Sequence, residues 1–199
     1  MGCCASYDCT PNSSFMKSLD KISYSNTKDK DSIYGNSNFS YCCFNGNGVV
    51  KLINGKKRVR ELKKGDILDN GGKIKCLIEM PVNSIHEVVI IKGALFTPHH
   101  PIKINNSWKY PSDIYPVTKK YIDSFFNVVL ENIHEINING IDTITLGHNR
   151  HEERLEHSYF GTNKVIKDLQ KYSTYKDGYI KATCLKAKRG DDGKVKSLF

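Results

Sequence analysis

The sequence predicts an all-β domain followed by a small C-terminal helical extension. Short apolar and β-branched runs recur along the chain, and glycine-containing turns separate them. Asn54-Gly55 and Asn139-Gly140 are the clearest of these turns, because Asn-Gly favours tight β-hairpins. After Gly147 the β-type spacing stops and a helical spacing begins. Together these features indicate hairpins first and a helix later.

The β-type runs are expected at residues 49–53, 67–68, 74–78, 86–91, 102–104, 125–130, 136–138 and 143–146. A helix is expected over 163–172, because Val165, Ile166 and Leu169 recur on one helical face. Thr162 precedes it and is a favourable N-cap residue.

The expected organisation has four parts. Residues 1–42 form a flexible polar leader, with a short helix over 15–22. Residues 43–149 form the β domain, 150–182 a C-terminal extension with one helix, and 183–199 a loose basic tail.

The chain has 199 residues, of which 39% are hydrophobic, and a formal net charge of +9. This length suits one domain with tails. The positive charge favours anionic partners, either nucleic acid or anionic lipid headgroups. Because the basic residues are spread along the chain, a solvated surface is favoured over nucleic-acid binding.

The chain has seven cysteines, an odd number that does not suit a complete disulfide framework. Their spacing fits no zinc motif. The first residues lack the apolar core of a secretory signal, and no run is long enough to span a membrane. A cytoplasmic, reducing location is therefore expected.

The first residues, Met1 to Ser6, fit the N-myristoylation pattern, with Gly2 as the acceptor after removal of Met1. Cys3 and Cys4 would then be sites for palmitate. The hypothesis is a lipoprotein anchored to the cytosolic face of a membrane, since stable anchoring needs two signals. The alternative is a chance Met-Gly start with two unused thiols.

The segment Cys42-Cys43-Phe44-Asn45-Gly46 and the later Thr97-Pro98-His99-His100 suggest chemistry on the chain's own backbone. The Cys43 sulfur can attack the carbonyl of Cys42 in an N-to-S acyl shift, which forms a thioester. His100 is the candidate general acid for the leaving amine, and Thr97 can orient the scissile amide. Backbone N–H groups near the turn are the expected oxyanion donors.

These residues resemble the Hint domain, the self-processing module of hedgehog proteins and inteins. The matching segments, in chain order, are 43–46, 50–55, 60–68, 95–101, 127–130, 139–140 and 145–148. The resemblance implies an all-β Hint (hedgehog/intein-like) fold and autocatalytic cleavage. Segments 157–162 and 165–169 also resemble the Hint variant found beside von Willebrand A domains, although no strand–helix alternation of the length such a domain needs is visible.

The fate of the thioester depends on the second end of the domain. His148-Asn149 resembles the last residues of splicing inteins, but Arg150 follows where those inteins carry a nucleophile. Splicing is therefore not expected, and cyclisation of Asn149 with help from His148 is disfavoured. The expected partners are the chain's own leader as substrate and water or a small nucleophile as acceptor. The basic tail does not resemble a sterol-recruiting region.

His148, His151 and His157, with Glu152 and Glu153 nearby, are candidate metal ligands by residue type. A solvated helical face is favoured for this segment, so no metal and no cofactor are expected. The function predicted is single-turnover self-cleavage between Cys42 and Cys43. The alternative is a non-catalytic, membrane-anchored Hint scaffold, and a nucleic-acid binder would rest on charge alone.

Overall fold

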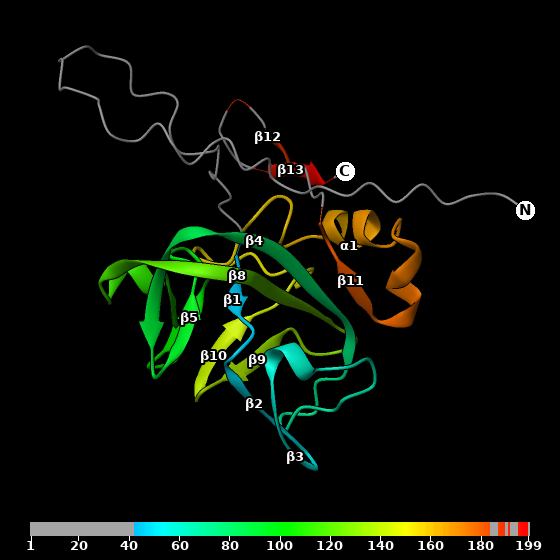
Figure 1. Ribbon diagram of the computed structural model, residues 1–199, viewed down its shortest axis with the longest axis horizontal. Coiled ribbons are helices and arrows are strands. Elements are labelled where there is room, and N and C mark those ends of the chain that lie inside the picture. Colours follow the sequence, from blue (N-terminus) through cyan, green and yellow to red (C-terminus); the bar gives the residue numbers. More distant parts are fainter. Residues whose placement is uncertain (1–41, 184–186, 190, 192–194, 199) are drawn as a thin grey trace, which may run out of the picture. The chain divides into compact units, whose positions relative to one another are not determined.

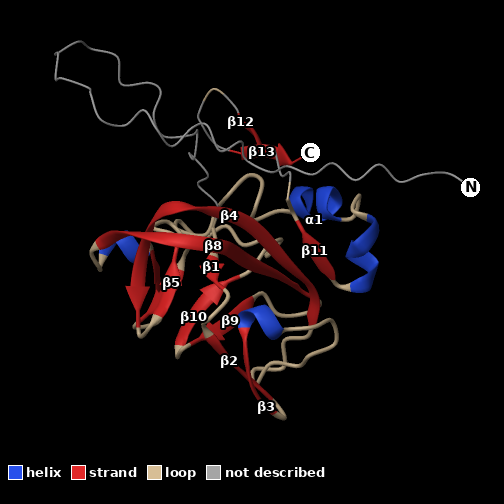
Figure 2. Ribbon diagram, viewed as in Figure 1, coloured by secondary structure: helices blue, strands red, loops and turns tan. Residues whose placement is uncertain are grey.

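The computed structural model describes residues 42–183, 187–189, 191 and 195–198. Strands dominate the described residues (Figure 2). The one α-helix among them is accompanied by short 3₁₀ turns, so the predicted all-β fold with a helical extension is confirmed. The helix expected over 15–22 and the acylation candidates Gly2, Cys3 and Cys4 lie outside the described residues. No helix in the described part is long and apolar enough to cross a membrane.

The first sheet has the strand order β11-β4-β5-β1-β8, and β4 also pairs directly with β8 (Figure 1). Only β11 runs parallel to its neighbour in this sheet. Its strands are β1 (Phe44–Asn45), β4 (Ile74–Ile91), β5 (Ala94–Phe96), β8 (Val117–Leu130) and β11 (Tyr179–Lys181).

The second sheet has the order β3-β2-β9-β10-β6-β7, and all of its pairings are antiparallel. Its strands are β2 (Val49–Leu52), β3 (Gly55–Arg58), β6 (Ile102–Ile104), β7 (Ser107–Lys109), β9 (Glu135–Ile138) and β10 (Ile141–Ile144). The turns predicted at Asn54-Gly55 and Asn139-Gly140 close the β2–β3 and β9–β10 hairpins. Short 3₁₀ turns lie at Val59–Glu61 and Pro111–Asp113.

The strand β4 is longer than the sequence predicts, because two separate strands were expected at 74–78 and 86–91. Pro81 and Asn83 argue against a continuous strand, since proline removes a ladder donor. The structure accommodates them with a shift of register against β8 between Pro81 and Ser84, where Asn83 has φ 44°. A bulge therefore keeps both halves in one strand. The run expected at 67–68 forms only isolated bridges.

Two groups of buried side chains form the interior. One contains Phe44, Val50 and Ile138 and joins strands of the two sheets. In β2, Val50 and Leu52 are buried whereas the alternate positions are exposed, as the two-residue period of a strand requires. The other group joins Cys43 and the β4–β8 ribbon to the C-terminal extension.

The extension contains α1 (Asn163–Leu169), whose Thr162 cap accepts a hydrogen bond from the Lys164 N–H at 3.3 Å. The predicted helix and its cap are confirmed, and a 3₁₀ turn at Ser173–Asp177 follows. The loose tail expected over 183–199 is wrong for its described residues. There β12 (Ala187–Arg189) pairs with β13 (Val195–Leu198), and burial of Val195 against the extension provides an apolar contact that holds the pair.

Candidate functional site

The first strand brings the two predicted motifs together. The Phe44 position of β1 pairs with Phe96 of β5 on one side and with Phe126 of β8 on the other. Cys43 immediately precedes this strand, and Thr97 immediately follows β5. Residues separated by more than fifty positions therefore meet at the Cys42–Cys43 peptide bond.

Thr97 holds the nitrogen side of that bond. The Cys43 N–H donates to Thr97 Oγ1 at 3.1 Å, and the Thr97 N–H donates to the Cys43 carbonyl at 2.9 Å. The Thr97 hydroxyl also lies 3.3 Å from the same carbonyl oxygen. These contacts fix the orientation of the Cys43 amide, and Cys43 itself is buried.

Asn127 of β8 holds the carbonyl side, and it is not among the site residues expected from the sequence. Its Nδ2 donates to the carbonyl oxygen of Cys42 at 2.5 Å. Its Oδ1 accepts the Val128 N–H at 2.7 Å, which assigns the amide orientation and aims the NH₂ group at Cys42. One feature of the sequence could have revealed it: Asn127 is a polar residue within an otherwise apolar run expected to be buried.

His100 is fully buried beside the same bond, with its ring edge-on to Phe44 at 5.3 Å between centroids. Its Nε2 lies 3.0 Å from the Ile144 carbonyl oxygen. A carbonyl can only accept, so Nε2 carries the proton and Nδ1 of the neutral ring is a free lone pair. Nδ1 makes no hydrogen bond among the described residues.

Burial lowers the pKa of His100 to about 4, while the backbone of Ile144 and of Cys42 acts in the opposite direction. At neutral pH the imidazole is uncharged, so it can accept a proton at Nδ1 before it can donate one.

Both cysteines are protonated thiols in this environment. Burial raises the pKa of Cys43 well above its ordinary value, and the neighbouring Cys42 sulfur raises it further. Burial also raises the pKa of Cys42 to about 12, and its Sγ lies 3.7 Å from the His99 carbonyl oxygen. A nucleophilic Cys43 therefore needs a base beside it.

His148 lies in the turn after β10 and is buried, with 7% of its surface exposed. Its Nδ1 accepts the Arg150 N–H at 3.0 Å, so Nε2 carries the proton of the neutral ring. Burial, followed by His134 and Arg150, lowers its pKa to about 4. Gly161 packs against this ring, where an added Cβ would lie 3.0 Å from Cε1.

A small cavity connects His148 to the scissile bond. Its volume is about 20 Å³, close to the space needed for one water molecule. The residues around it come from both the β domain and the extension: Cys42, Pro101, Asn127, Ile144, Thr145, Leu146, His148, Leu155, His157, Phe160 and Gly161.

Asn149 follows His148 in the chain but does not line the cavity. It is exposed and has a left-handed φ of 52°. Its N–H donates to the Gly161 carbonyl at 2.6 Å. Its Nδ2 lies 3.2 Å from the Gly147 carbonyl oxygen and 3.3 Å from Asn163 Oδ1. These contacts engage the side-chain nitrogen that cyclisation would require to attack the Asn149 carbonyl carbon.

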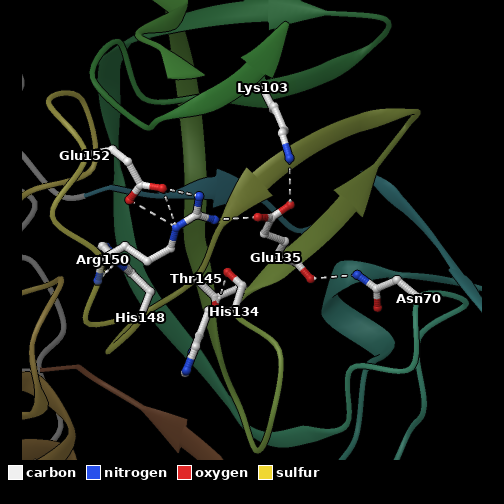
Figure 3. A network of polar contacts seen from close by, with 8 residues as sticks. All are labelled: Asn70, Lys103, His134, Glu135, Thr145, His148, Arg150 and Glu152. Carbon is white, nitrogen blue, oxygen red and sulfur yellow. Dashed lines mark hydrogen bonds and ion pairs between the residues drawn. The ribbon is translucent and has the colours of Figure 1, made fainter. Parts of the chain in front are cut away.

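Arg150, the residue after Asn149, belongs to a network of polar contacts (Figure 3). The Arg150 guanidinium pairs with Glu152 and, at 2.5 Å, with Glu135 of β9. Glu135 also faces Lys103 of β6 at 3.6 Å. Arg150 further lies over the Trp108 ring, 5.2 Å from its centroid. The backbone on the C-terminal side of Asn149 is thus anchored to the second sheet.

The solvated helical face expected around His148, His151 and His157 is wrong. The segment consists of turns, because α1 begins only at Asn163. His148 is buried and His157 is half-buried at the cavity, while His151 is exposed. No group of three or more metal-binding side chains is found in the described part of the chain.

Comparison with known proteins identifies the fold family. A family model described as Vint: Hint-domain matches residues 42–196. The chain belongs to this Hint-domain family. The narrower prediction, a Hint variant associated with von Willebrand A domains, stays a prediction. No curated protein matches the chain.

Several solved inteins resemble part of this Hint domain. The gp41-1 intein is 12% identical and covers 53% of this chain and 100% of its own, with a TM-score of 0.42. The bacterial intein-like domain from Clostridium thermocellum is 10% identical, covers 53% of this chain and 100% of its own, and has a TM-score of 0.44. The Ssp DnaB mini-intein variant M86 is 9% identical, covers 52% of this chain and 93% of its own, and has a TM-score of 0.40.

Proposed function

We propose that this Hint domain cleaves its own chain between Cys42 and Cys43 through a thioester. The observation that carries the proposal is that two side chains hydrogen-bond to this one peptide bond. Asn127 donates to its carbonyl oxygen, and Thr97 accepts from its N–H. A buried imidazole with a free lone pair beside it supplies the remaining group.

The first step is attack by the Cys43 sulfur on the carbonyl carbon of Cys42. His100 Nδ1 accepts the thiol proton, which is necessary because burial keeps Cys43 protonated. The carbonyl oxygen becomes an oxyanion, and the Asn127 Nδ2 already donates to it. A donor preorganised in a buried site stabilises developing charge more effectively than water does.

The second step breaks the bond between the Cys42 carbonyl carbon and the Cys43 nitrogen. The oxyanion collapses to the thioester, and the nitrogen takes the proton that His100 carried. In balance, one proton moves from sulfur to nitrogen and one C–N bond is exchanged for one C–S bond. His100 is therefore base first and acid second, whereas the residue pattern alone indicates only the acid role.

The third step releases the leader. Water attacks the thioester carbonyl, and the Cys43 sulfur leaves and is reprotonated. The products are residues 1–42 with a new carboxylate and a Hint domain with Cys43 at its N-terminus. The cavity beside Cys42 supports water or another small nucleophile, because it has room for about one water molecule.

Acylation of Gly2 would couple this reaction to a membrane. Cleavage would leave a lipid-anchored leader and release the Hint domain into the cytoplasm. The motivation is the order of the two sequence features, an acylation pattern upstream and a cleavage site downstream. Fractionation of cells expressing the chain tests it: leader and domain still joined in the membrane fraction would count against the coupling.

The decisive test of cleavage is the intact mass of the purified chain, incubated with and without dithiothreitol. Thiols cleave thioesters and leave amides intact, so fragments split at Cys42/Cys43 should accumulate faster with dithiothreitol. Cys43→Ala should stay whole, while Cys42→Ala, which keeps the nucleophile, should still cleave. A chain that stays whole under every condition would instead favour the non-catalytic scaffold.

A further inference from the structure

The β2–β3 hairpin and the loop after it concentrate the positive charge of the chain. Residues 49–67 contain seven lysines and arginines against two carboxylates, a net +5 within a whole-chain net charge of +9. The basic residues look dispersed along the sequence, but the β2–β3 pairing brings Lys51, Lys56, Lys57 and Arg58 together. Figure 1 shows this hairpin projecting at the lower edge of the domain, at the far end from α1.

The register of the hairpin aligns cations on its outer face. Lys51 of β2 is directly opposite Lys56 of β3, and Val49 is opposite Arg58. Val50 and Leu52 occupy the inner face, so these pairs point outward. Like charges opposite one another destabilise a strand pair. Lys51, Lys56, Arg58 and Lys63 form no ion pair with any described residue, so this repulsion is left uncompensated.

The acidic residues of the region do little to neutralise that face. Asp66 is paired with Lys57 at 2.8 Å, and Glu61 accepts the Arg58 backbone N–H at 3.0 Å. Asp69 is a third, exposed carboxylate near this face. Its backbone N–H donates to the Lys51 carbonyl at 3.2 Å, which places it beside Lys51.

Two exposed isoleucines lie at and beside the tip of the hairpin. Ile53 is 65% exposed and Ile67 is 37% exposed. The two are adjacent, because the Ile53 N–H donates to the Ile67 carbonyl at 3.1 Å. Two exposed isoleucines surrounded by lysines are unfavourable in water, but they match an interface where anionic headgroups lie above acyl chains.

We propose that this basic hairpin, residues 49–67, docks the domain on the surface of an anionic lipid bilayer. Ile53 and Ile67 enter the headgroup region, and Lys51, Lys56, Arg58 and Lys63 contact the lipid phosphates and carboxylates. Nucleic acid is the less suitable partner, because the hairpin carries no aromatic side chain for base stacking and it exposes two isoleucines, Ile53 and Ile67. This contact is independent of N-terminal acylation and of self-cleavage.

The test uses the full chain with Gly2→Ala and Cys43→Ala, which removes the acyl acceptor and keeps the chain in one piece. Sedimentation with phosphatidylcholine vesicles, with and without an equimolar share of phosphatidylserine, measures the partition coefficient. We expect binding to the anionic vesicles that weakens as salt is raised. Absence of binding to anionic vesicles would overturn the proposal.

Matched variants locate the contact. Lys51→Glu with Lys56→Glu should lower partitioning at least about tenfold, because each cation near an anionic surface contributes to binding. The control is Lys119→Glu with Lys120→Glu on β8, which makes the same change in net charge away from the hairpin. It should change the logarithm of the partition coefficient by less than about a third as much. Ile53→Ser should lower partitioning severalfold, whereas Ile85→Ser, on an equally exposed isoleucine of β4, should not.

Circular dichroism establishes that each variant is folded. Equal losses for the hairpin variants and their β8 and β4 controls would overturn the assignment to the hairpin. Binding to a DNA duplex that Lys51→Glu with Lys56→Glu abolishes, without any vesicle binding, would identify nucleic acid as the partner and would also overturn it.

Discussion

The Asn127 side-chain amide nitrogen lies 2.5 Å from the carbonyl oxygen of Cys42. The Asn127 Oδ1 is held by the Val128 N–H, so the donor cannot rotate away without breaking that bond. This places a fixed donor on the oxygen that would become negative when the Cys43 sulfur attacks. The expected oxyanion donors were backbone N–H groups near the turn, so the side chain of β8 replaces them in the proposed mechanism.

Replacement of Asn127 tests that role. Asn127→Ala should slow thioester formation by about 10²–10³-fold, the usual effect of removing one oxyanion donor. The rate of dithiothreitol-dependent cleavage, followed by intact mass, measures it. Asn137→Ala is the control and should cleave at the wild-type rate, because this half-buried side chain of β9 hydrogen-bonds Asp142 and the Gly140 N–H and not Cys42. Wild-type cleavage by Asn127→Ala would remove Asn127 from the mechanism.

Thr97 offers a conservative pair of substitutions. Thr97→Val removes the acceptor of the Cys43 N–H and should slow cleavage. It should also lower the free energy of unfolding by about 1–3 kcal/mol, because a buried donor is left unpaired. Thr97→Ser keeps the hydroxyl and should retain most of the cleavage rate. Urea unfolding and intact mass separate the two effects. Equal cleavage by the valine and serine variants would show that the hydroxyl has no part in the reaction.

The buried histidines predict an acid-sensitive fold. Burial lowers the pKa of His100 and of His148 from 6.5 to about 4. Between these values the unfolded chain binds protons that the folded chain does not, so the free energy of unfolding falls as the pH falls from 6.5 towards 4. Each histidine contributes up to about 3 kcal/mol to this loss, and full stability is present above pH 6.5.

Urea midpoints measured across that pH range test this prediction. His100→Gln keeps a polar group of similar size and should flatten the pH dependence, because one titrating group is removed. A wild-type stability that stays constant over the range would contradict it. So would a His100→Gln variant with the wild-type pH dependence.

The second end of the domain should stay intact. Asn149 has a left-handed backbone and its Nδ2 contacts Gly147 and Asn163, while Arg150 is anchored by Glu135. We therefore expect no fragment that ends at residue 149. Asn149→Gly tolerates the same φ and should leave cleavage at Cys43 unchanged. Mass spectrometry that finds a cut before Arg150, abolished by Asn149→Gly, would contradict this expectation.

The extension should be part of the stable unit. Leu169 of α1 is buried in the same apolar group as Cys43 and Phe160. Leu169→Ala should lower the free energy of unfolding by about 2–5 kcal/mol. Cleavage should slow as well, because Phe160 and Gly161 line the cavity. Lys167→Ala, on a more exposed position of the same helix, is the control and should change the unfolding free energy little.

Much of the fold could be predicted from local sequence. The Asn-Gly turns closed hairpins where expected, and Thr162 capped the predicted helix, because both depend on the conformations available to a few neighbouring residues. Short strands such as β1 and β7 were missed, since so few residues show no period. They form because their partners across the sheet are present.

The site was predictable to the extent that its motifs are local. The sequence by itself determined the Hint fold, the Cys43 and Thr97–His100 motifs, and the signals for a helix and its cap. Only the tertiary structure decided that Asn127 reaches Cys42, that His100 holds a free lone pair at Nδ1, and that His148 is buried at a cavity. Each of these depends on which distant strands lie side by side, and burial then sets the protonation state of the groups enclosed between them.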